Sequence, residues 1–354
     1  MASIPTVRAL PWKVSLATIC MVSASMLPAQ TCQIAAEVDP ARLDKIHAAA
    51  QRYADLAQQG DLSALQAAST PGAAGEFSPV TKETFSRLPG GGKSAMLAAF
   101  LLDASASDAP LPHAEFLCGS FSRNGQTANS AIFTLTNLHP AEYAVIEFGI
   151  DPTKPADQPV NLSLVLQNLA LTTNGAEKTP PTDDWKLAAA YVNPSRMAGH
   201  DSDWFAASAK QFEEKKQLHN AWLYLQTARA LASPLPFMSN ARTDALYDEG
   251  HKIQPSDFPV DGKPVDFQAG TASQTLIGIG VQDTGGDLTL VVRYRAASVA
   301  DTVHTRAQSM DLIRALLHKL PELRSAFGAV VARAVTPAGA DFGTRVEMES
   351  ILPI

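Results

Sequence analysis

The spacing of apolar residues near the start of the chain predicts a long amphipathic helix. Asp39 fits the N-cap, a proline follows it and Gly60 lies just past the last turn, so the pattern predicts a helix over residues 40–59. Its apolar face contains Leu43, Ile46, Ala50, Tyr53, Ala54 and Ala57. That face needs a cover, which the strands that follow can supply. Shorter helices are expected over residues 61–69 and 93–103.

Between residues 113 and 192 the pattern changes to the alternation of apolar and polar residues that is typical of strands. The expected strands cover residues 114–122, 128–136, 143–150, 160–171 and 185–192. The pair Asn124-Gly125 separates the first two, and Asn-Gly is a strong hairpin signal because both turn residues must tolerate a positive φ. A second such pair, Asn174-Gly175, precedes the last strand. Together these segments predict an antiparallel sheet of about five strands.

This order of elements resembles that of a known fold. A leading helix, a small second helix and a curved antiparallel sheet that ends in a Trp-Lys-Leu strand resemble the NTF2-like cone fold over residues 39–193. The resemblance implies a first domain over residues 39–195. NTF2-like domains include enzymes with a pocket in the cone as well as plain binding or dimerisation modules, so the resemblance implies no single function.

The next segment predicts a helical hairpin. Two helical patterns, residues 201–214 and 218–233, are joined by only three residues, which leaves room for an antiparallel pair alone. Their apolar positions resemble those of one tetratricopeptide unit: Phe205, Phe212, Ala221, Leu225, Ala228 and the following Pro234. A single hairpin docked on the first sheet domain is expected. Trp204, Trp222 and Tyr224 could offer an aromatic surface to a partner, although aromatic residues at this spacing also fit a core.

A short helix over residues 243–250 completes a helical segment that spans residues 200–250, and residues 251–266 predict a linker because their prolines cannot continue a helix. Residues 267–354 then predict a small C-terminal α+β domain with the order ββαββ. Its elements are expected at residues 274–282, 287–295, 301–320, 329–336 and 344–351. The predicted fold class is therefore α+β, with a helix-and-sheet domain, a helical hairpin and a C-terminal domain.

The first residues have the pattern of an export signal. Arg8 and Lys13 precede an apolar run over residues 14–27. That run is shorter than the roughly 20 residues that a membrane-spanning helix needs, so it predicts a signal peptide over residues 1–31 and a periplasmic or secreted mature protein. A retained N-terminal anchor and a lipid on Cys32 are the alternatives.

Charge narrows the range of partners. Without the predicted signal peptide the chain would carry 26 basic and 35 acidic residues, a formal net charge of −9 instead of −7. Phosphate backbones would be repelled, which argues against nucleic-acid binding. No other apolar run reaches the length of a membrane span. Cys32 and Cys118 could form a disulfide in an oxidising compartment, or Cys118 could pack as a buried thiol while Cys32 stays free.

The sequence contains no complete motif for a nucleotide site or a helical metal site. Gly90-Gly91-Gly92-Lys93-Ser94 resembles the end of a phosphate loop, but the pattern requires glycine where Arg87 stands. The histidines include no pair four residues apart. His200, Asp201 and His219 form one cluster of interest, although Asp201 also fits a helix N-cap. No cofactor and no metal are expected.

Catalytic residues are not assigned by the sequence. Glu142 and Glu147 bracket a predicted strand, but carboxylates at strand ends are usually solvated. Acid and base roles would need both groups in one cleft.

Two functions remain. The first is an exported interaction or scaffold protein of the bacterial envelope, which meets its partner through the hairpin and the sheet edges. The second is a small-molecule binder or enzyme with a site in the mouth of the first sheet, which predicts a closed, mainly apolar pocket with at least two convergent polar groups. Around residues 185–239 the chain also resembles uncharacterised exported proteins of soil bacteria, which implies no function.

Overall fold

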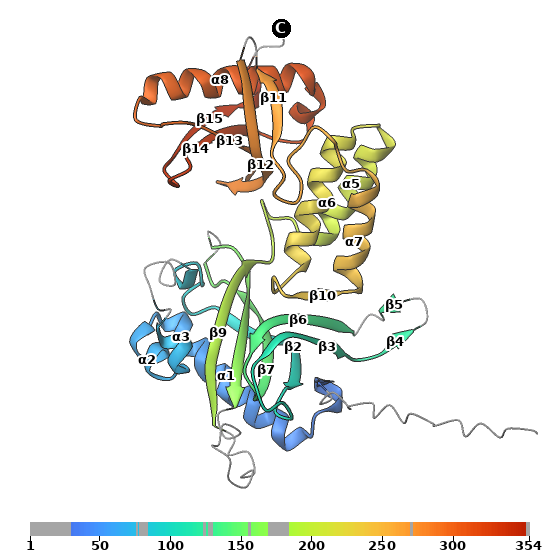
Figure 1. The fold of residues 1–354 in the computed structure, drawn as a ribbon, viewed down its shortest axis with the longest axis vertical. Helices are drawn as coiled ribbons and strands as arrows, with labels where there is room; N and C mark the ends of the chain where they lie inside the picture. The colour runs from blue at the N-terminus through green and yellow to red at the C-terminus, as the bar shows by residue number, and fades with distance from the viewer. Residues whose placement is uncertain are drawn as a thin grey trace, which may run out of the picture.

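The computed structural model is of the α+β class (Figure 1). It describes residues 30–75, 77, 84–122, 125–126, 130–154, 157–168, 184–269 and 272–351. The predicted signal peptide up to residue 29, the residue Asn124 and the pair Asn174-Gly175 lie outside the described residues.

The predicted long helix is confirmed as α1 (Pro40–Gln59). The Asp39 carboxylate accepts a hydrogen bond from a backbone N–H of the first turn, and Gly60 ends the helix in the left-handed conformation with φ 71°. The helix packs on a five-stranded antiparallel sheet with the order β1-β2-β7-β8-β9. The strands are β1 (Thr31–Ile34), β2 (Lys93–Asp103), β7 (Glu142–Asp151), β8 (Val160–Asn168) and β9 (Trp185–Pro194). The buried Tyr53 hydroxyl donates to the Trp185 carbonyl oxygen at 2.8 Å and so ties α1 to the last strand.

Three short elements flank α1: the 3-10 helix η1 (Ala35–Glu37) and the helices α2 (Leu62–Ala67) and α3 (Pro71–Gly75). The helix α2 begins after Asp61, as the sequence predicts.

The helix predicted over residues 93–103 is wrong, because this segment is the strand β2. Its sequence is rich in alanine and leucine, which favour a helix, and its C-terminal half is buried on both faces, so apolar and polar residues do not alternate there. Pairing with β1 and β7 on its two sides overrides this local preference. A bulge between Met96 and Ala98 further blurs the pattern.

The five strands predicted for the first domain do not form one sheet. The first two, β3 (Leu111–Cys118) and β6 (Ala131–Leu138), form a second sheet with β10 (Met238–Asn240) in the order β10-β6-β3. The small strands β4 (Phe121–Ser122) and β5 (Gly125–Gln126) pair at the predicted hairpin. The second sheet packs on the five-stranded sheet because β7 is buried on both faces and needs a second layer, where the Phe100 and Phe133 rings meet at 5.1 Å.

Cys32 and Cys118 form a disulfide, with the two Cα atoms 4.9 Å apart. The bond joins β1 of the large sheet to β3 of the small one. Of the two states that the sequence left open for these cysteines, the structure contains the paired one.

The helical segment consists of α5 (Ser202–Glu214), α6 (Leu218–Ala232) and α7 (Ala241–Lys252). The C-terminal sheet has the order β11-β12-β13-β14-β15. Its strands are β11 (Val265–Ala269), β12 (Ala272–Thr284), β13 (Asp287–Arg295), β14 (Ala329–Val335) and β15 (Asp341–Glu347). The helix α8 (Thr302–Lys319) connects β13 to β14, which are parallel, and the 3-10 helices η3 (Pro321–Ser325) and η4 (Met348–Ser350) follow α8 and β15. The predicted order ββαββ is present, with β11 as an added edge strand that begins inside the predicted linker.

The hairpin does not dock on the first sheet domain, which corrects the prediction. The α5–α6 hairpin shares one hydrophobic core with the C-terminal sheet and α8, which includes Phe205, Leu225, Leu276 and Leu316. The connection between α6 and α7 reaches the N-terminal sheets, where Leu235 is buried and β10 pairs with β6 (Figure 1). Large apolar residues line both sides of α6, so the helix needs the larger cover that the C-terminal domain offers.

Candidate functional site

One face of the C-terminal sheet packs against α8 and the α5–α6 hairpin, which share its hydrophobic core. The buried side chains of β13 and β14 that point toward α8 include Val292 and Val330, and Tyr294 on this face lies 3.0 Å from Ser309 of α8, measured between the two hydroxyl oxygens. Because side chains alternate between the faces of a strand, the residues between these positions point to the opposite side. On that side Thr289, Val291 and Ala329 are buried, whereas Arg293, Arg295 and Arg333 are exposed.

A row of residues crosses this face at its centre. Arg293 of β13 lies beside Arg333 of β14 in the parallel register, and both are exposed. The neighbours of this pair on the outer strands are Gly278 of β12 and Gly343 of β15. Since both glycines lack a side chain, the two guanidinium groups stand above a low surface. Arg295 lies two residues further along β13 on the same face. We call this surface, with Arg345, the arginine face.

The charges of the arginine face are only partly balanced. Arg333 forms an ion pair with Asp341 at 3.0 Å, and Arg345 pairs with Glu347. All four side chains are well exposed, and exposed ion pairs contribute only about 0–1 kcal/mol, so either arginine can exchange its partner. Neither Arg293 nor Arg295 has an ion pair with any residue that the structure describes. The centre of the face is therefore basic on a protein that is acidic overall.

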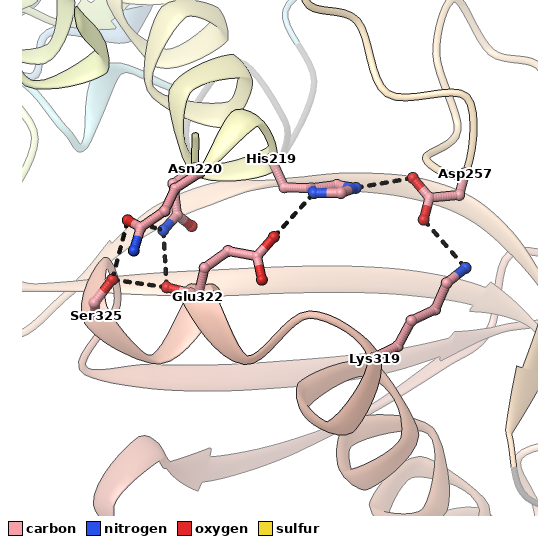
Figure 2. A network of polar contacts seen from close by, with 7 residues as sticks. His219, Asn220, Asp257, Lys319, Glu322 and Ser325 are labelled. Carbon is pink, nitrogen blue, oxygen red and sulfur yellow. Dashed lines mark hydrogen bonds and ion pairs between the residues drawn. The ribbon is translucent and has the colours of Figure 1, made fainter. Parts of the chain in front are cut away.

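A polar network holds the hairpin against the C-terminal domain (Figure 2). The His219 ring of α6 bridges two carboxylates, with Nδ1 3.1 Å from Glu322 Oε1 and Nε2 2.9 Å from Asp257 Oδ1. Lys319 at the end of α8 binds the other oxygen of Asp257 at 3.1 Å. The Asn220 side chain donates to the Glu322 carbonyl oxygen at 2.8 Å. These contacts join α6, the segment before β11, α8 and η3, and we call them the His219 clamp.

The contacts of the His219 clamp stabilise the charged form of Asp257. Burial alone would raise the pKa of Asp257, but the hydrogen bonds from His219 and Lys319 outweigh burial and hold that pKa below its ordinary value. The two carboxylates bind opposite edges of the imidazole, so they cannot share one metal ion with it. Within the described ranges no group of three or more His, Cys, Asp or Glu side chains could hold a metal. The network thus acts as a structural clamp.

The three aromatic residues singled out in the sequence do not form a common surface. Trp222 and Tyr224 are buried in the core, and the Tyr224 hydroxyl donates to the Ala326 carbonyl oxygen at 2.9 Å. Trp204 is 37% exposed and stacks on His200, with ring centroids 3.6 Å apart. Trp222 and Tyr224 therefore occupy core positions, which the sequence left open as the alternative.

The cluster of His200, Asp201 and His219 is not brought together as a site. Asp201 caps α5 by accepting from the Trp204 backbone N–H at 2.9 Å, as the sequence allows. His200 stacks on Trp204, and His219 belongs to the clamp.

The expectation that Glu142 and Glu147 are solvated is wrong, because both are buried. Glu142 faces α1, where it pairs with Arg42 at 2.5 Å and accepts from the Asn168 amide at 3.2 Å. Glu147 faces the opposite layer and is 9% exposed. Its Oε1 atom has no hydrogen-bond partner among the described residues, and burial raises its pKa from 4.5 to about 7.

The first domain contains a cavity of about 220 Å³ beside β9. Its lining is mainly apolar, from Phe77, Phe85 and the segment of residues 187–191. Tyr191 alone, of the described lining residues, carries a polar group. The second functional hypothesis needs at least two convergent polar groups. The described residues that line this cavity provide one, but a larger hollow of about 410 Å³ in the same domain is lined by Arg87, Asp157 and Gln158 as well as apolar residues, so the hypothesis stays a prediction.

The arginine face was not predicted from the sequence. The alternation of Arg293 and Arg295 on one strand was a readable signal, but their alignment with Arg333 depends on a register between distant strands.

In the part of the chain that the structure describes, no helix is long and apolar enough to span a membrane. Comparisons with protein-family models, curated proteins and solved structures find no match to this chain. The NTF2-like and tetratricopeptide-like resemblances therefore stay predictions.

Proposed function

We propose that this chain is an exported, non-catalytic interaction protein of the bacterial envelope, and that its arginine face binds an acidic segment of a protein partner. The observation that carries the proposal is the uncovered row of arginines on one face of the C-terminal sheet. A sheet face normally packs against another layer. The exposed arginines on this face favour a layer that carries negative charge.

The chemistry of the face favours carboxylates. Arginine presents a planar fork of donors that matches a carboxylate with two parallel hydrogen bonds. Gly278 and Gly343 flank Arg293 and Arg333, so a polypeptide can approach the sheet closely at both ends of the row. Asp341 and Glu347 already pair with arginines here, which is the same chemistry supplied from within the chain.

A protein partner fits better than a nucleic acid. A nucleic acid presents a continuous line of phosphates that the acidic remainder of the molecule would repel, with a formal net charge of −7 over the chain. A short acidic segment needs to match only the few arginines at the centre of the face.

Export is supported by two features, the charged and apolar pattern of the first residues and the disulfide between Cys32 and Cys118, since structural disulfides persist in oxidising compartments. Intact mass measurement on protein from the periplasm tests it, because a signal peptide that has been removed leaves a shortened N-terminus.

The test of partner binding is a selection of displayed peptides of about ten residues, enough to cross the face at roughly 3.3 Å per residue. The full protein is expected to enrich peptides that contain several Asp or Glu residues. The double variant Arg293→Ser with Arg333→Ser is expected to lose that enrichment. Its matched control is Arg306→Ser with Arg314→Ser, which removes the same charge from exposed positions of α8.

Loss of acidic enrichment in both double variants would mean that net charge alone attracts the peptides. Enrichment of apolar or basic peptides by the full protein would contradict the proposal outright.

A further inference from the structure

The α6–α7 connection, residues 233–240, lies on the face of the large sheet that is turned away from α1. Leu235 is buried there in one core cluster with Val145 of β7. The Asn193 side-chain amide of β9 donates to the Pro234 carbonyl oxygen at 2.7 Å. Apolar packing and a hydrogen bond thus hold the connection on the large sheet.

Glu147 lies under this connection. It points to the same face of β7 as Val145, two residues away, and its partner in the register is Ser163 of β8. The Ser163 hydroxyl in turn donates to the Pro234 carbonyl oxygen at 3.5 Å. Since directly opposite residues of paired strands have Cβ atoms roughly 5 Å apart, the Glu147 carboxyl lies beside the point where the connection touches the sheet.

This carboxyl is buried without full hydrogen bonding. Glu147 is 9% exposed, and its Oε1 atom has no hydrogen-bond partner among the described residues. A buried carboxylate without a partner is costly, whereas the neutral acid is tolerated more easily. The docked connection therefore favours the protonated form of Glu147.

The described surroundings of Glu147 contain no charge close enough to offset its own. The α6–α7 connection has no charged residue, and the inward side chains of β3 and β6 are apolar. The charged residues on this face of the large sheet are Lys93, Asp151 and Lys186. They lie in rows four residues from Glu147 along β7, which is about 13 Å. Salt screens charges over about that distance.

The other titratable groups on this face are two tyrosines, Tyr143 of β7 and Tyr191 of β9. Burial raises the pKa of Tyr143 to about 12 and that of Tyr191 above its ordinary value. Both hydroxyls therefore stay neutral over the pH range in which a carboxyl titrates. Glu147 alone, among the described groups of this interface, changes its charge there.

From this geometry we propose that Glu147 is a pH-sensitive latch for the α6–α7 connection. The neutral carboxyl keeps the connection docked on the large sheet, and the ionised carboxylate favours a state in which the connection lifts and water reaches Glu147. Because α6 and α7 pack in the C-terminal part of the molecule, the latch controls how firmly the two parts are joined. It does not depend on the function proposed for the arginine face.

The direction of the effect follows from the pKa values of the two states. When the connection is docked, burial raises the pKa of Glu147 to about 7, and when the connection lifts, the hydrated carboxyl returns to its ordinary value of 4.5. The docked state therefore holds the proton more tightly. Docking is strongest below pH 4.5, weakens as the pH rises and reaches its weakest level above pH 7.

Hydrogen exchange of the Thr134 amide in the full protein tests the latch. This N–H donates to the Phe237 carbonyl oxygen at 2.9 Å, so it loses its protection when the connection lifts. The protection factor, which is corrected for the intrinsic pH dependence of exchange, is expected to fall roughly 70-fold from pH 5 to pH 8 for these two pKa values. The Ala296 amide, which donates to the Val335 carbonyl oxygen in the C-terminal sheet, should stay better protected than Thr134 at pH 8.

Glu147→Gln keeps the shape of the side chain but cannot ionise, so its Thr134 protection factor is expected to stay within about twofold over the same range. The matched control is Glu115→Gln, which removes the same charge from an exposed position of β3 and should keep the full fall. The pH dependence of the unaltered protein decides the test if Glu147→Gln does not fold.

Three results overturn the proposal. The first is a Thr134 protection factor that does not change with pH in the unaltered protein. The second is an equal fall in Glu147→Gln and in the unaltered protein. The third is equal protection of Thr134 and Ala296 at every pH, which would show that the molecule unfolds as a whole and that the connection does not lift by itself.

Discussion

At the scale of single residues, Glu142 and Glu147 show how one strand places two glutamate side chains in different environments. They lie on opposite faces of β7, since their positions differ by an odd number. Glu142 meets Arg42 of α1, whereas Glu147 enters the interface with the second layer without a cation beside it among the described residues. Burial then disfavours the charged form of Glu147 and raises its pKa to about 7.

Replacement of Glu147 by Gln should remove a pH dependence of stability. Its pKa is 4.5 when unfolded and about 7 when folded, so Glu147 costs nothing below pH 4.5 and destabilises the fold as the pH rises toward 7. Each unit of pKa shift corresponds to about 1.4 kcal/mol, which gives a difference of about 3 kcal/mol in the free energy of unfolding at pH 8. Urea unfolding of both proteins from pH 4.5 to 8 measures it.

The matched control is Glu142→Gln, which should lose stability near pH 7 because Arg42 loses its ion pair. Parallel pH curves for Glu147→Gln and the unaltered protein would rule out the buried-charge explanation.

At the scale of secondary-structure elements, the position of the α5–α6 hairpin depends on what covers its outer sides. The apolar spacing of residues 201–233 predicts that α5 and α6 pack on each other, but not what covers their outer sides. The cover is the C-terminal domain, and the His219 clamp fixes the orientation of α6 against α8 and η3. Both His219 nitrogens contact carboxylates, so the ring satisfies two acidic groups at once.

His219→Phe should destabilise the junction while it keeps a ring against Phe258. Asp257 and Glu322 would each lose a hydrogen bond at a site where all three side chains are largely buried, so the free energy of unfolding should fall by about 1–3 kcal/mol. Urea unfolding near pH 7 measures the change. Arg242→Ala breaks the exposed pair with Asp203 and should change stability by less than about 1 kcal/mol. A loss no larger than this in His219→Phe would show that the clamp contributes little.

At the scale of the whole molecule, the described residues form two parts, and the boundary between these parts differs from the predicted one. The helical segment shares the core of the C-terminal sheet, and the α6–α7 connection contributes β10 to the N-terminal sheets. The predicted linker over residues 251–266 lies inside the second part, where Phe258 is buried and β11 begins. A division near residue 196 keeps the core that the hairpin shares with the C-terminal sheet in one part, whereas a division at residue 251 splits it.

A fragment of residues 196–354 is therefore expected to unfold cooperatively by itself, whereas a fragment of residues 251–354 is not. The shorter fragment loses the hairpin half of the shared core, including Phe205 and Leu225, and would expose Leu276. Calorimetry of the two fragments tests this. Equal cooperativity would instead restore the boundary that the sequence suggested.

Local sequence signals predict helices well where the capping residue lies directly beside the helix. Asp39, Asp201 and Asp301 cap α1, α5 and α8 as their positions suggest, because capping depends only on neighbouring residues. The order of the C-terminal elements follows from the same kind of signal.

Only the tertiary structure decided the features that depend on distant pairing. The alanine- and leucine-rich β2 is a strand because β1 and β7 flank it, and the predicted single sheet is two because β7 needs cover on both faces. Arg293 and Arg295 alternate visibly in the sequence, but the arginine face exists because α8 covers the other side and brings Arg333 into register. A sequence fixes which residues alternate on a strand, while packing between elements decides which side stays open.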